Sequence, residues 1–340
     1  MPKQVIFDKK NVLVAGGAGF IGSHLCDELI KTNKVICVDN FISGTERNID
    51  HLLAHPDFVF INHDLNLPLD LESIEDLKKF KVEFQGLQEI YNLACPMSPK
   101  NFLANRLSTL LANSVVVKNL LDLSVKYQAK FLQFSSAVVY GPRNNANPEL
   151  KFKEDELGLV DQLSERSSYD EGKRFSETVV ANYRSIYNID ARIIRLFRVY
   201  GPRMAAGDDQ IIPDYINSAL ENKDIVINGD ANFSSSFCYI DDVIDAVFKL
   251  MNSELAGPVN VGSDVDTNLT DLVNLIKQEA KAQSNIVYAD SKLFISELIL
   301  PDINLAKNEL GWMPVVTLSN GLKKTIFDLQ ANKRLQGFGS

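Results

Sequence analysis

Tyr169 and Lys173 are the residues whose types and spacing most directly indicate chemistry in this sequence. They form a Tyr-x-x-x-Lys pattern, and one helical turn would place both side chains on the same face of a helix. A nearby ammonium group lowers the pKa of a phenol, which makes the tyrosine a usable general base near neutral pH. We therefore predict that Tyr169 removes a proton from a hydroxyl group.

A serine-rich turn precedes this pair. The apolar segment Phe131–Phe134 is typical of a buried strand, and the sequence SSAVVYG follows it at residues 135–141. Ser136 is placed there to hydrogen-bond the reacting hydroxyl of a substrate. Together with Tyr169 and Lys173 it forms the predicted catalytic set. The alternative is an ordinary Ser/Gly turn beside an unrelated helix, since surface helices are rich in tyrosine and lysine.

Three glycines near the start of the chain indicate a phosphate-binding turn. Gly16, Gly19 and Gly22 directly follow a predicted strand at Asn11–Ala15 and open a predicted helix at Ile21–Lys31. Glycines let the backbone turn tightly and approach a pyrophosphate, whose charge is met by the free N–H groups at the start of the helix. The spacing and its strand–turn–helix context predict dinucleotide binding.

Two carboxylates at strand ends refine this prediction. Asp39 follows the second predicted strand, Val35–Val38, where it can accept hydrogen bonds from ribose hydroxyls and repel a 2′-phosphate. This favours NAD over NADP, although Arg47 is the nearest base and keeps NADP open. Asp64 ends the third predicted strand, and it either caps the adenine edge or is a solvated loop carboxylate.

The order of the predicted elements indicates an α/β fold. Strands alternate with helices in the first half of the chain, and the strands are apolar without polar alternation, which predicts a parallel sheet covered by helices on both faces. After about residue 190 the pattern loosens into loop-rich segments. The further predicted elements are strands at Phe58–Ile61, Glu89–Leu93 and Ala191–Leu196, a long helix at Leu103–Lys126, and two last helices near Asp271–Ala282 and Ser319–Asn332.

Composition excludes several classes of protein. The 340 residues carry a net charge of -9, which argues against a nucleic-acid-binding surface. The four cysteines show no metal-type spacing, so we expect small buried side chains and no metal site. The start of the chain has no apolar signal region, and no run is long enough to span a bilayer, so we expect a cytoplasmic protein without membrane contact. All four histidines precede Asp64, which excludes a later histidine-based site.

Six segments together carry a resemblance to a known family. GGAGFIGSH, VDNFISGTERN, SSAVVYG, YDEGKR, YGPRM and YIDDV resemble the extended short-chain dehydrogenase/reductase family of nucleotide-sugar epimerases, dehydratases and decarboxylases. Within it, ACPMSPKNF, YDEGKR and LPDINLAKNELGWMP are most similar to UDP-glucuronate decarboxylases. The resemblance implies a Rossmann-type doubly wound parallel sheet that binds NAD (residues 1–190). It also implies a smaller substrate-binding domain (residues 191–335), with some segments returning to the sheet, and usually a homodimer.

The resemblance also implies a reaction through transient oxidation at sugar C4. Tyr169 would remove the hydroxyl proton while NAD accepts the hydride, and the bound NADH would later return it. Lys173 would lower the Tyr169 pKa and hold the nicotinamide ribose, and Ser136 would orient the hydroxyl. The implied cofactor contacts are Gly16, Gly19, Phe20, Ile21, Gly22, Asp39, Asn40, Asp64, Leu65, Ala94, Asn113 and Lys173. The implied contacts to a UDP- or dTDP-linked sugar are Pro96, Ser136, Arg198 and Arg203.

The residues after Ser136 depart from the family. Dehydratases carry an Asp-Glu pair there, and decarboxylases carry a glutamate two residues before the tyrosine of their VYG segment. Here these positions hold Ala137 and Val138, which cannot transfer a proton. Dehydration is disfavoured, and C4 epimerisation becomes the main prediction because the keto sugar need only rotate and be reduced on its other face. Decarboxylation is the alternative, since a β-keto acid loses carbon dioxide readily.

Phosphate recognition also departs from the family. Relatives have asparagine at Arg198, arginine at Ser235, and commonly a basic residue at Leu300. Losing a bidentate phosphate ligand costs affinity unless another arginine compensates, and Arg198 or Arg203 could do so. We hypothesise that Arg198 contacts the diphosphate or a sugar carboxylate. Without such compensation, the chain would be an NAD-binding protein with lost or altered sugar chemistry.

Two further alternatives remain open. An ordinary dehydrogenase would release NADH, whereas an epimerase keeps its cofactor and shows no net redox change. The helical stretches Leu103–Leu123 and Tyr169–Tyr187 carry apolar residues beyond one core stripe. They either pair across a two-fold axis as a four-helix bundle or pack against the sheet of their own chain.

Overall fold

The chain forms two compact units that alternate along the sequence. The computed structural model describes residues 9–142, 150–229, 233–290 and 300–337. Within these ranges, unit 1 comprises residues 9–96, 107–134 and 174–193, and unit 2 comprises the rest. Because the units exchange segments several times, they do not correspond to a single cut near residue 190, and the functional division into 1–190 and 191–335 stays a prediction.

A seven-stranded sheet has the strand order β12-β7-β5-β4-β1-β2-β3. The pairs of β1 with β2 and β4, of β2 with β3, of β4 with β5, and of β7 with β12 all run parallel. Strands β2 and β3 lie on one side of β1, and the later strands β4, β5, β7 and β12 lie on the other side. The strand order therefore reverses between β1 and β4, and ligands of such sheets bind at this switch point. The strands are β1 (Asn11–Ala15), β2 (Lys34–Asp39), β3 (Phe58–Asn62), β4 (Glu89–Asn92), β5 (Lys130–Ser136), β7 (Ala191–Leu196) and β12 (Val259–Val261).

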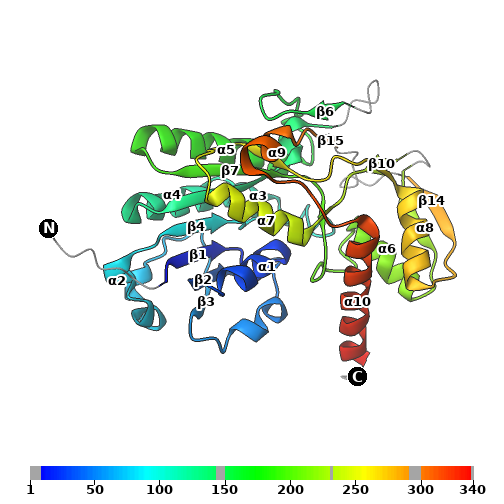
Figure 1. Cartoon of the computed structure of the whole chain (residues 1–340), viewed down its shortest axis with the longest axis horizontal. Coiled ribbons are helices and arrows are strands. Elements are labelled where there is room, and N and C mark those ends of the chain that lie inside the picture. The colour runs from blue at the N-terminus through cyan, green and yellow to red at the C-terminus, as the bar shows by residue number, and fades with distance from the viewer. Residues whose placement is uncertain (1–8, 143–149, 230–232, 291–299, 338–340) are drawn as a thin grey trace. The chain divides into compact units, whose positions relative to one another are not determined.

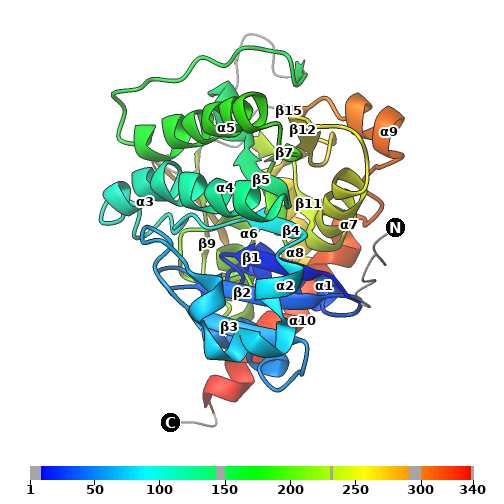
Figure 2. The same cartoon turned by 90° about the vertical axis from the view of Figure 1, so that its left-hand side faces the viewer.

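Helices accompany these strands as the alternating pattern predicted. The strand residues are almost all buried, which explains their apolar sequence (for example NVLVA in β1). Figure 2 shows β3, β2, β1 and β4 in succession within unit 1. The helices of this part are α1 (Phe20–Leu29), α2 (Val82–Gln85), α3 (Arg106–Ala112), α4 (Val115–Tyr127) and α5 (Ser167–Tyr187), with short 3-10 turns η1 (Glu46–Asn48), η2 (Asp50–Leu52), η3 (Leu71–Ser73) and η4 (Glu75–Phe80).

The prediction of one long helix at Leu103–Lys126 is wrong. Helix α3 ends at Ala112 and α4 begins at Val115. Between them the Asn113 amide donates to the Thr109 carbonyl (2.9 Å), and the Ser114 hydroxyl donates to the Leu110 carbonyl (2.7 Å). Such side chains compete with backbone N–H groups for helix carbonyls, and the helix breaks here.

Unit 2 is richer in helices than the sequence predicted. Its further helical elements are the turn η5 (Ala137–Tyr140) and helices α6 (Ile211–Leu220), α7 (Ile240–Met251), α8 (Leu269–Ala280), α9 (Asn304–Leu310) and α10 (Leu318–Gly337). Its short strands form four pairs: β6 (Lys151–Phe152) with β15 (Leu300–Pro301), β8 (Val199–Tyr200) with β11 (Cys238–Tyr239), β9 (Ile225–Asn228) with β14 (Ile286–Ala289), and β10 (Ser234–Ser235) with β13 (Thr267–Asn268).

Helices α6, α8 and α10 pack together (Figure 1). The sequence prediction missed α6 and α7 because the Gly207-Asp208 and Gly229-Asp230 turn signals led it to assign this region as rich in loops. Across both units, none of the helices described here is long and apolar enough to cross a bilayer.

Asp242 anchors the segment that follows α9. Its side chain is buried in α7, and its two oxygens accept hydrogen bonds from the backbone N–H groups of Val315 (3.1 Å) and Val316 (3.0 Å). The indole of the fully buried Trp312 donates to the Asp242 carbonyl (2.8 Å). Three hydrogen bonds therefore fix the segment 312–316 to α7.

We expect Asp242→Ala to destabilise the protein by about 2 kcal/mol, because it leaves two backbone N–H groups without acceptors. The neighbouring Asp241 is a matched control, since it is exposed and forms a surface ion pair with Lys324 (3.1 Å). Asp241→Ala should cost less than about 1 kcal/mol. Urea unfolding measures both changes, and equal costs would contradict the anchoring role.

Candidate functional site

The turn between β1 and α1 leaves no room for side chains. Gly16 has φ +77°, and a Cβ there would lie 2.9 Å from the backbone nitrogen of Ala94. A Cβ on Gly22 would lie 2.2 Å from the Gly16 carbonyl oxygen. The backbone of the turn is therefore folded closely on itself and against the residues after β4, which is the close approach that a pyrophosphate-binding turn needs.

The start of α1 presents backbone donors. Gly19 is the N-cap residue and provides no side-chain acceptor. The first N–H groups of a helix have no intrahelical partner, and here they belong to Phe20, Ile21 and Gly22. Together with the positive end of the helix dipole, these donors suit a pyrophosphate.

Asp39 holds this turn from the end of β2. Its carboxylate is buried and accepts hydrogen bonds from the backbone N–H groups of Ala18 (3.0 Å) and Phe41 (2.8 Å). Burial raises the pKa of Asp39, and these N–H groups counteract that effect. Each carboxylate oxygen can accept more than one hydrogen bond, so ribose hydroxyls can share it. The adjacent Asn40 is half-buried.

Asn48 is a functional residue that the sequence analysis missed. It is buried, and its amide donates to the Ala18 carbonyl (2.9 Å), which also accepts from the Thr45 N–H (3.1 Å). Asn48 thus ties the loop after β2 to the glycine turn. The signal was present, since Asn48 ends the VDNFISGTERN segment that supports the family resemblance.

The other predicted cofactor contacts differ in burial. Leu65 is buried, whereas Asp64 is exposed and its carboxylate accepts from the N–H of Asn66 (3.0 Å), as a loop carboxylate would. Ala94 N–H donates to the Asn92 side chain (3.2 Å). Arg47, the base that kept NADP open, is exposed.

Thr109 connects Asn113 with Pro96 by hydrogen bonds to both residues. The Thr109 hydroxyl donates to the Pro96 carbonyl (3.3 Å), and its own carbonyl accepts from Asn113. The Asn113 side-chain oxygen is buried and has no hydrogen-bond partner among the described residues. A buried acceptor of this kind calls for a donor. This orphaned oxygen and the side-chain-free glycine turn both fit a bound dinucleotide.

The predicted catalytic set lies in unit 2. Ser136 ends β5, is half-buried, and accepts a long hydrogen bond from the Val138 N–H (3.4 Å). Tyr169 lies in the first turn of α5, and the ammonium of the buried Lys173 is 5.8 Å from the centre of the Tyr169 ring. The helix brings Tyr169 and Lys173 together on one face, as the spacing predicted.

The turn after Ser136 is apolar and tightly held. Ala137 and Val138 are buried and apolar, so neither residue supplies an acid. Tyr140 donates to the Asn260 side chain (2.8 Å) and accepts from Arg195 (2.7 Å), and burial raises the pKa of Tyr140 to about 12. Tyr140 therefore stays protonated at neutral pH and serves to fix the turn.

Arg198 contacts Ser235, the position where relatives carry arginine. The Arg198 Nε donates to the Ser235 hydroxyl (3.1 Å), and the Arg198 carbonyl accepts from the Cys238 N–H (2.9 Å). Ser235 is buried and Arg198 half-buried. Burial, then the charge of Arg166, lowers the pKa of Arg198 to about 10, so the guanidinium stays charged. A cation is thus retained beside Ser235.

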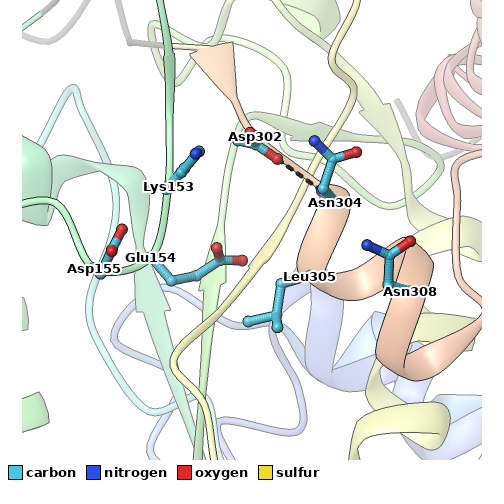
Figure 3. A pocket seen from close by; sticks show the side chains of 7 residues that line it. All are labelled: Lys153, Glu154, Asp155, Asp302, Asn304, Leu305 and Asn308. Atoms are coloured by element: carbon cyan, nitrogen blue, oxygen red, sulfur yellow. Dashed lines mark hydrogen bonds between the residues drawn. The ribbon is translucent and has the colours of Figure 1, made fainter.

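Arg203 and Leu300, two other positions that the sequence analysis singled out, have contacts of their own. Arg203 has φ +68°, and its N–H donates to Asp328 (3.0 Å). Leu300 is buried in β15. A separate open pocket in unit 2 contains none of the predicted catalytic residues (Figure 3) and is lined by Lys153, Glu154, Asp155, Asp302, Asn304, Leu305 and Asn308.

We expect Gly22→Ala to abolish tight dinucleotide binding, because its Cβ cannot fit against the Gly16 carbonyl. Gly19→Ala is a graded control, since its Cβ would lie 3.2 Å from the same oxygen and requires only a small shift. Calorimetric titration with NAD measures both variants, with circular dichroism to verify folding. Wild-type NAD affinity in folded Gly22→Ala would refute the predicted role of the turn.

Comparison with known proteins agrees with this geometry. Residues 12–262 match the model of the NAD dependent epimerase/dehydratase family. The chain is 35% identical over 321 residues to UDP-glucuronic acid decarboxylase 1 of Xenopus tropicalis, covering 94% of this chain and 72% of that protein.

Two solved structures are similar over nearly the whole chain. UDP-glucose 4-epimerase of Thermotoga maritima with UDP-glucose has a TM-score of 0.82 at 26% identity, covering 95% of this chain and 99% of that one. UDP-glucuronic acid 4-epimerase of Bacillus cereus, in complex with UDP-glucuronic acid and NAD, has a TM-score of 0.81 at 27% identity, with the same coverage. The glycine turn, the sheet order and the extent of these matches establish that the chain belongs to the NAD dependent epimerase/dehydratase family, an enzyme family whose cofactor is NAD.

Proposed function

We propose that this enzyme interconverts the C4 epimers of a nucleotide-linked sugar through transient oxidation at C4. The observation that carries this proposal is the combination of Ser136, Tyr169 and Lys173 with a turn that contains no acid. Ala137 and Val138 are buried and apolar. The site can therefore move a hydroxyl proton, but it offers no acid–base pair beside Ser136 for elimination of water.

Each catalytic residue has a defined role in this proposal. NAD, when bound, would supply the hydride acceptor for C4. Tyr169 takes the proton of the C4 hydroxyl and later gives it back. The Lys173 ammonium stabilises the phenolate and holds the ribose, and the Ser136 hydroxyl orients the sugar hydroxyl. Epimerisation needs no further residue, because the second face of the keto sugar is reduced by the same groups in reverse.

Decarboxylation is the second candidate. It is favoured by the 35% identity to a UDP-glucuronic acid decarboxylase over 94% of the chain. Once C4 of a glucuronate is oxidised, the carboxylate lies β to the ketone, and carbon dioxide leaves without an adjacent glutamate. Both candidate reactions use the same residues for the oxidation that forms the keto intermediate.

The proposed substrate is a UDP- or dTDP-linked sugar. The solved relatives contain UDP-glucose or UDP-glucuronic acid, and Arg198 supports binding of such an anion, because it is charged and held by Ser235. The proposed substrate contacts are Pro96, Ser136, Arg198 and Arg203. The cytoplasmic location stays a prediction.

The test is incubation of the purified protein and NAD with UDP-glucuronate, UDP-glucose, UDP-N-acetylglucosamine and dTDP-glucose separately, followed by proton NMR. We expect a C4 epimer from at least one donor. Tyr169→Phe is the matched control, and we expect it to lose turnover by at least 100-fold while it still binds NAD.

The other outcomes separate the alternatives. Formation of a UDP-pentose from UDP-glucuronate would show that the enzyme is a decarboxylase and not an epimerase. Accumulation of free NADH would indicate an ordinary dehydrogenase. Unchanged donors together with bound NAD would refute the proposal in favour of a binding protein.

We also propose that the enzyme is a homodimer. Within unit 1, α3 and α5 expose large apolar side chains, which soluble monomers seldom cluster. They are Leu107 (75% exposed), Leu110 (43%), Leu111 (43%), Phe175 (53%), Ile186 (69%) and Tyr187 (50%). A second copy of the same helices would cover them as a four-helix bundle.

Leu107→Asp should shift the protein to monomer in sedimentation velocity, because a carboxylate at the centre of the interface would be desolvated. Leu157→Asp is the control, since Leu157 is 94% exposed and lies outside these helices. A wild-type protein that sediments as a monomer would contradict the dimer.

A further inference from the structure

Tyr215 has a buried hydroxyl whose role the catalytic set does not explain. It lies in α6 with only 4% of its surface exposed, and its hydroxyl oxygen has no hydrogen-bond partner among the residues that the structure describes. Leaving such a group unpaired is costly, whereas phenylalanine would fill the same space without that cost. The hydroxyl therefore calls for a partner that the protein chain does not provide.

The charge with the largest effect on this hydroxyl is that of Arg198. Burial raises the pKa of Tyr215 to about 12, the Arg198 guanidinium opposes this rise, and the Asp214 carboxylate adds to it. Tyr215 is therefore a neutral phenol at neutral pH, and it can donate a hydrogen bond. Arg198 also donates a hydrogen bond to the buried Ser235 hydroxyl (3.1 Å).

The surroundings of Arg198 favour an anion. Arg166 lies close enough for its charge to lower the pKa of Arg198. Arg166 itself pairs with Asp170 through two hydrogen bonds of 3.2 Å. Arg166 and Arg198 thus bring two guanidinium charges into one partly desolvated region, and an added oxyanion would relieve the repulsion between them. Guanidinium and phenol groups both donate hydrogen bonds, and an oxyanion accepts from both.

We propose that Tyr215 is a specificity residue whose hydroxyl donates to an oxyanion of the substrate that Arg198 also binds. The oxyanion is either the diphosphate, which every nucleotide sugar carries, or the carboxylate of a uronate. This inference rests on the proposed function, because it assumes that the substrate is a nucleotide sugar. It adds a recognition residue that phenylalanine could not replace.

The test measures the affinities of UDP, UDP-glucose and UDP-glucuronate for the NAD-loaded wild type, Tyr215→Phe and Tyr288→Phe by calorimetry. Tyr288 is exposed and bonds Thr270 (2.9 Å), so its variant controls for loss of a tyrosine hydroxyl. We expect Tyr215→Phe to weaken binding about 10-fold, as for a hydrogen bond to a charged group, and Tyr288→Phe to leave it unchanged. Equal weakening of all three ligands would identify the diphosphate, and weakening of UDP-glucuronate alone would identify the carboxylate.

A stability measurement separates recognition from folding. Since Tyr215→Phe removes an unpaired buried hydroxyl, its melting temperature without ligand should equal or exceed that of the wild type. In a double-mutant cycle with Arg198→Gln, the effects on affinity should be non-additive, because both groups bind the same anion. Unchanged affinities in Tyr215→Phe, or a loss accompanied by a lower melting temperature, would overturn the inference alone. A wild type that binds none of the three ligands would overturn the inference and also refute the proposed function for UDP-linked sugars.

Discussion

The close backbone packing of the turn after β1 is the constraint on which the rest of the site depends. Gly16 meets the backbone after β4, Gly22 meets Gly16, and Asp39 and Asn48 fix Ala18 from the neighbouring strand and loop. These contacts require glycine at both positions and leave the first N–H groups of α1 available to a pyrophosphate. The turn lies at the point where the strand order reverses, which is where we propose that the cofactor binds.

A second rigid turn determines the chemistry open to the enzyme. The residues after Ser136 are held by the hydrogen bonds of Tyr140 to Asn260 and Arg195, and the two positions beside Ser136 are buried and apolar. In the proposed reaction, proton transfer is therefore assigned to Tyr169 with the support of Lys173. Family membership identifies NAD as the cofactor. Among the reactions of the family, this turn disfavours dehydration, because it lacks the acid and base that elimination of water requires.

Sequence patterns predicted the parts of the molecule that local chemistry controls. β1 and β7 have the predicted bounds, and the Tyr169–Lys173 pair lies on one helix face, because apolar runs and helical spacing are local signals. The break between α3 and α4 was missed because it depends on the Asn113 and Ser114 side chains bonding to helix carbonyls. Tyr215 and Asn48 were missed because their importance comes from burial and from partners distant in sequence. The sequence analysis hypothesised only that Arg198 compensates for the arginine absent at Ser235. The hydrogen bond between these two residues, which are 37 positions apart, could not be predicted from spacing.

The central claim is that the hydrogen at C4 leaves the sugar and returns to it within one site. The most direct measurement uses a donor that the enzyme turns over, labelled with deuterium at C4, incubated with unlabelled NAD and analysed by NMR. The account predicts that the product, whether epimer or pentose, retains deuterium at C4. Product with ordinary hydrogen at C4, or deuterium released in free NADH, would contradict it.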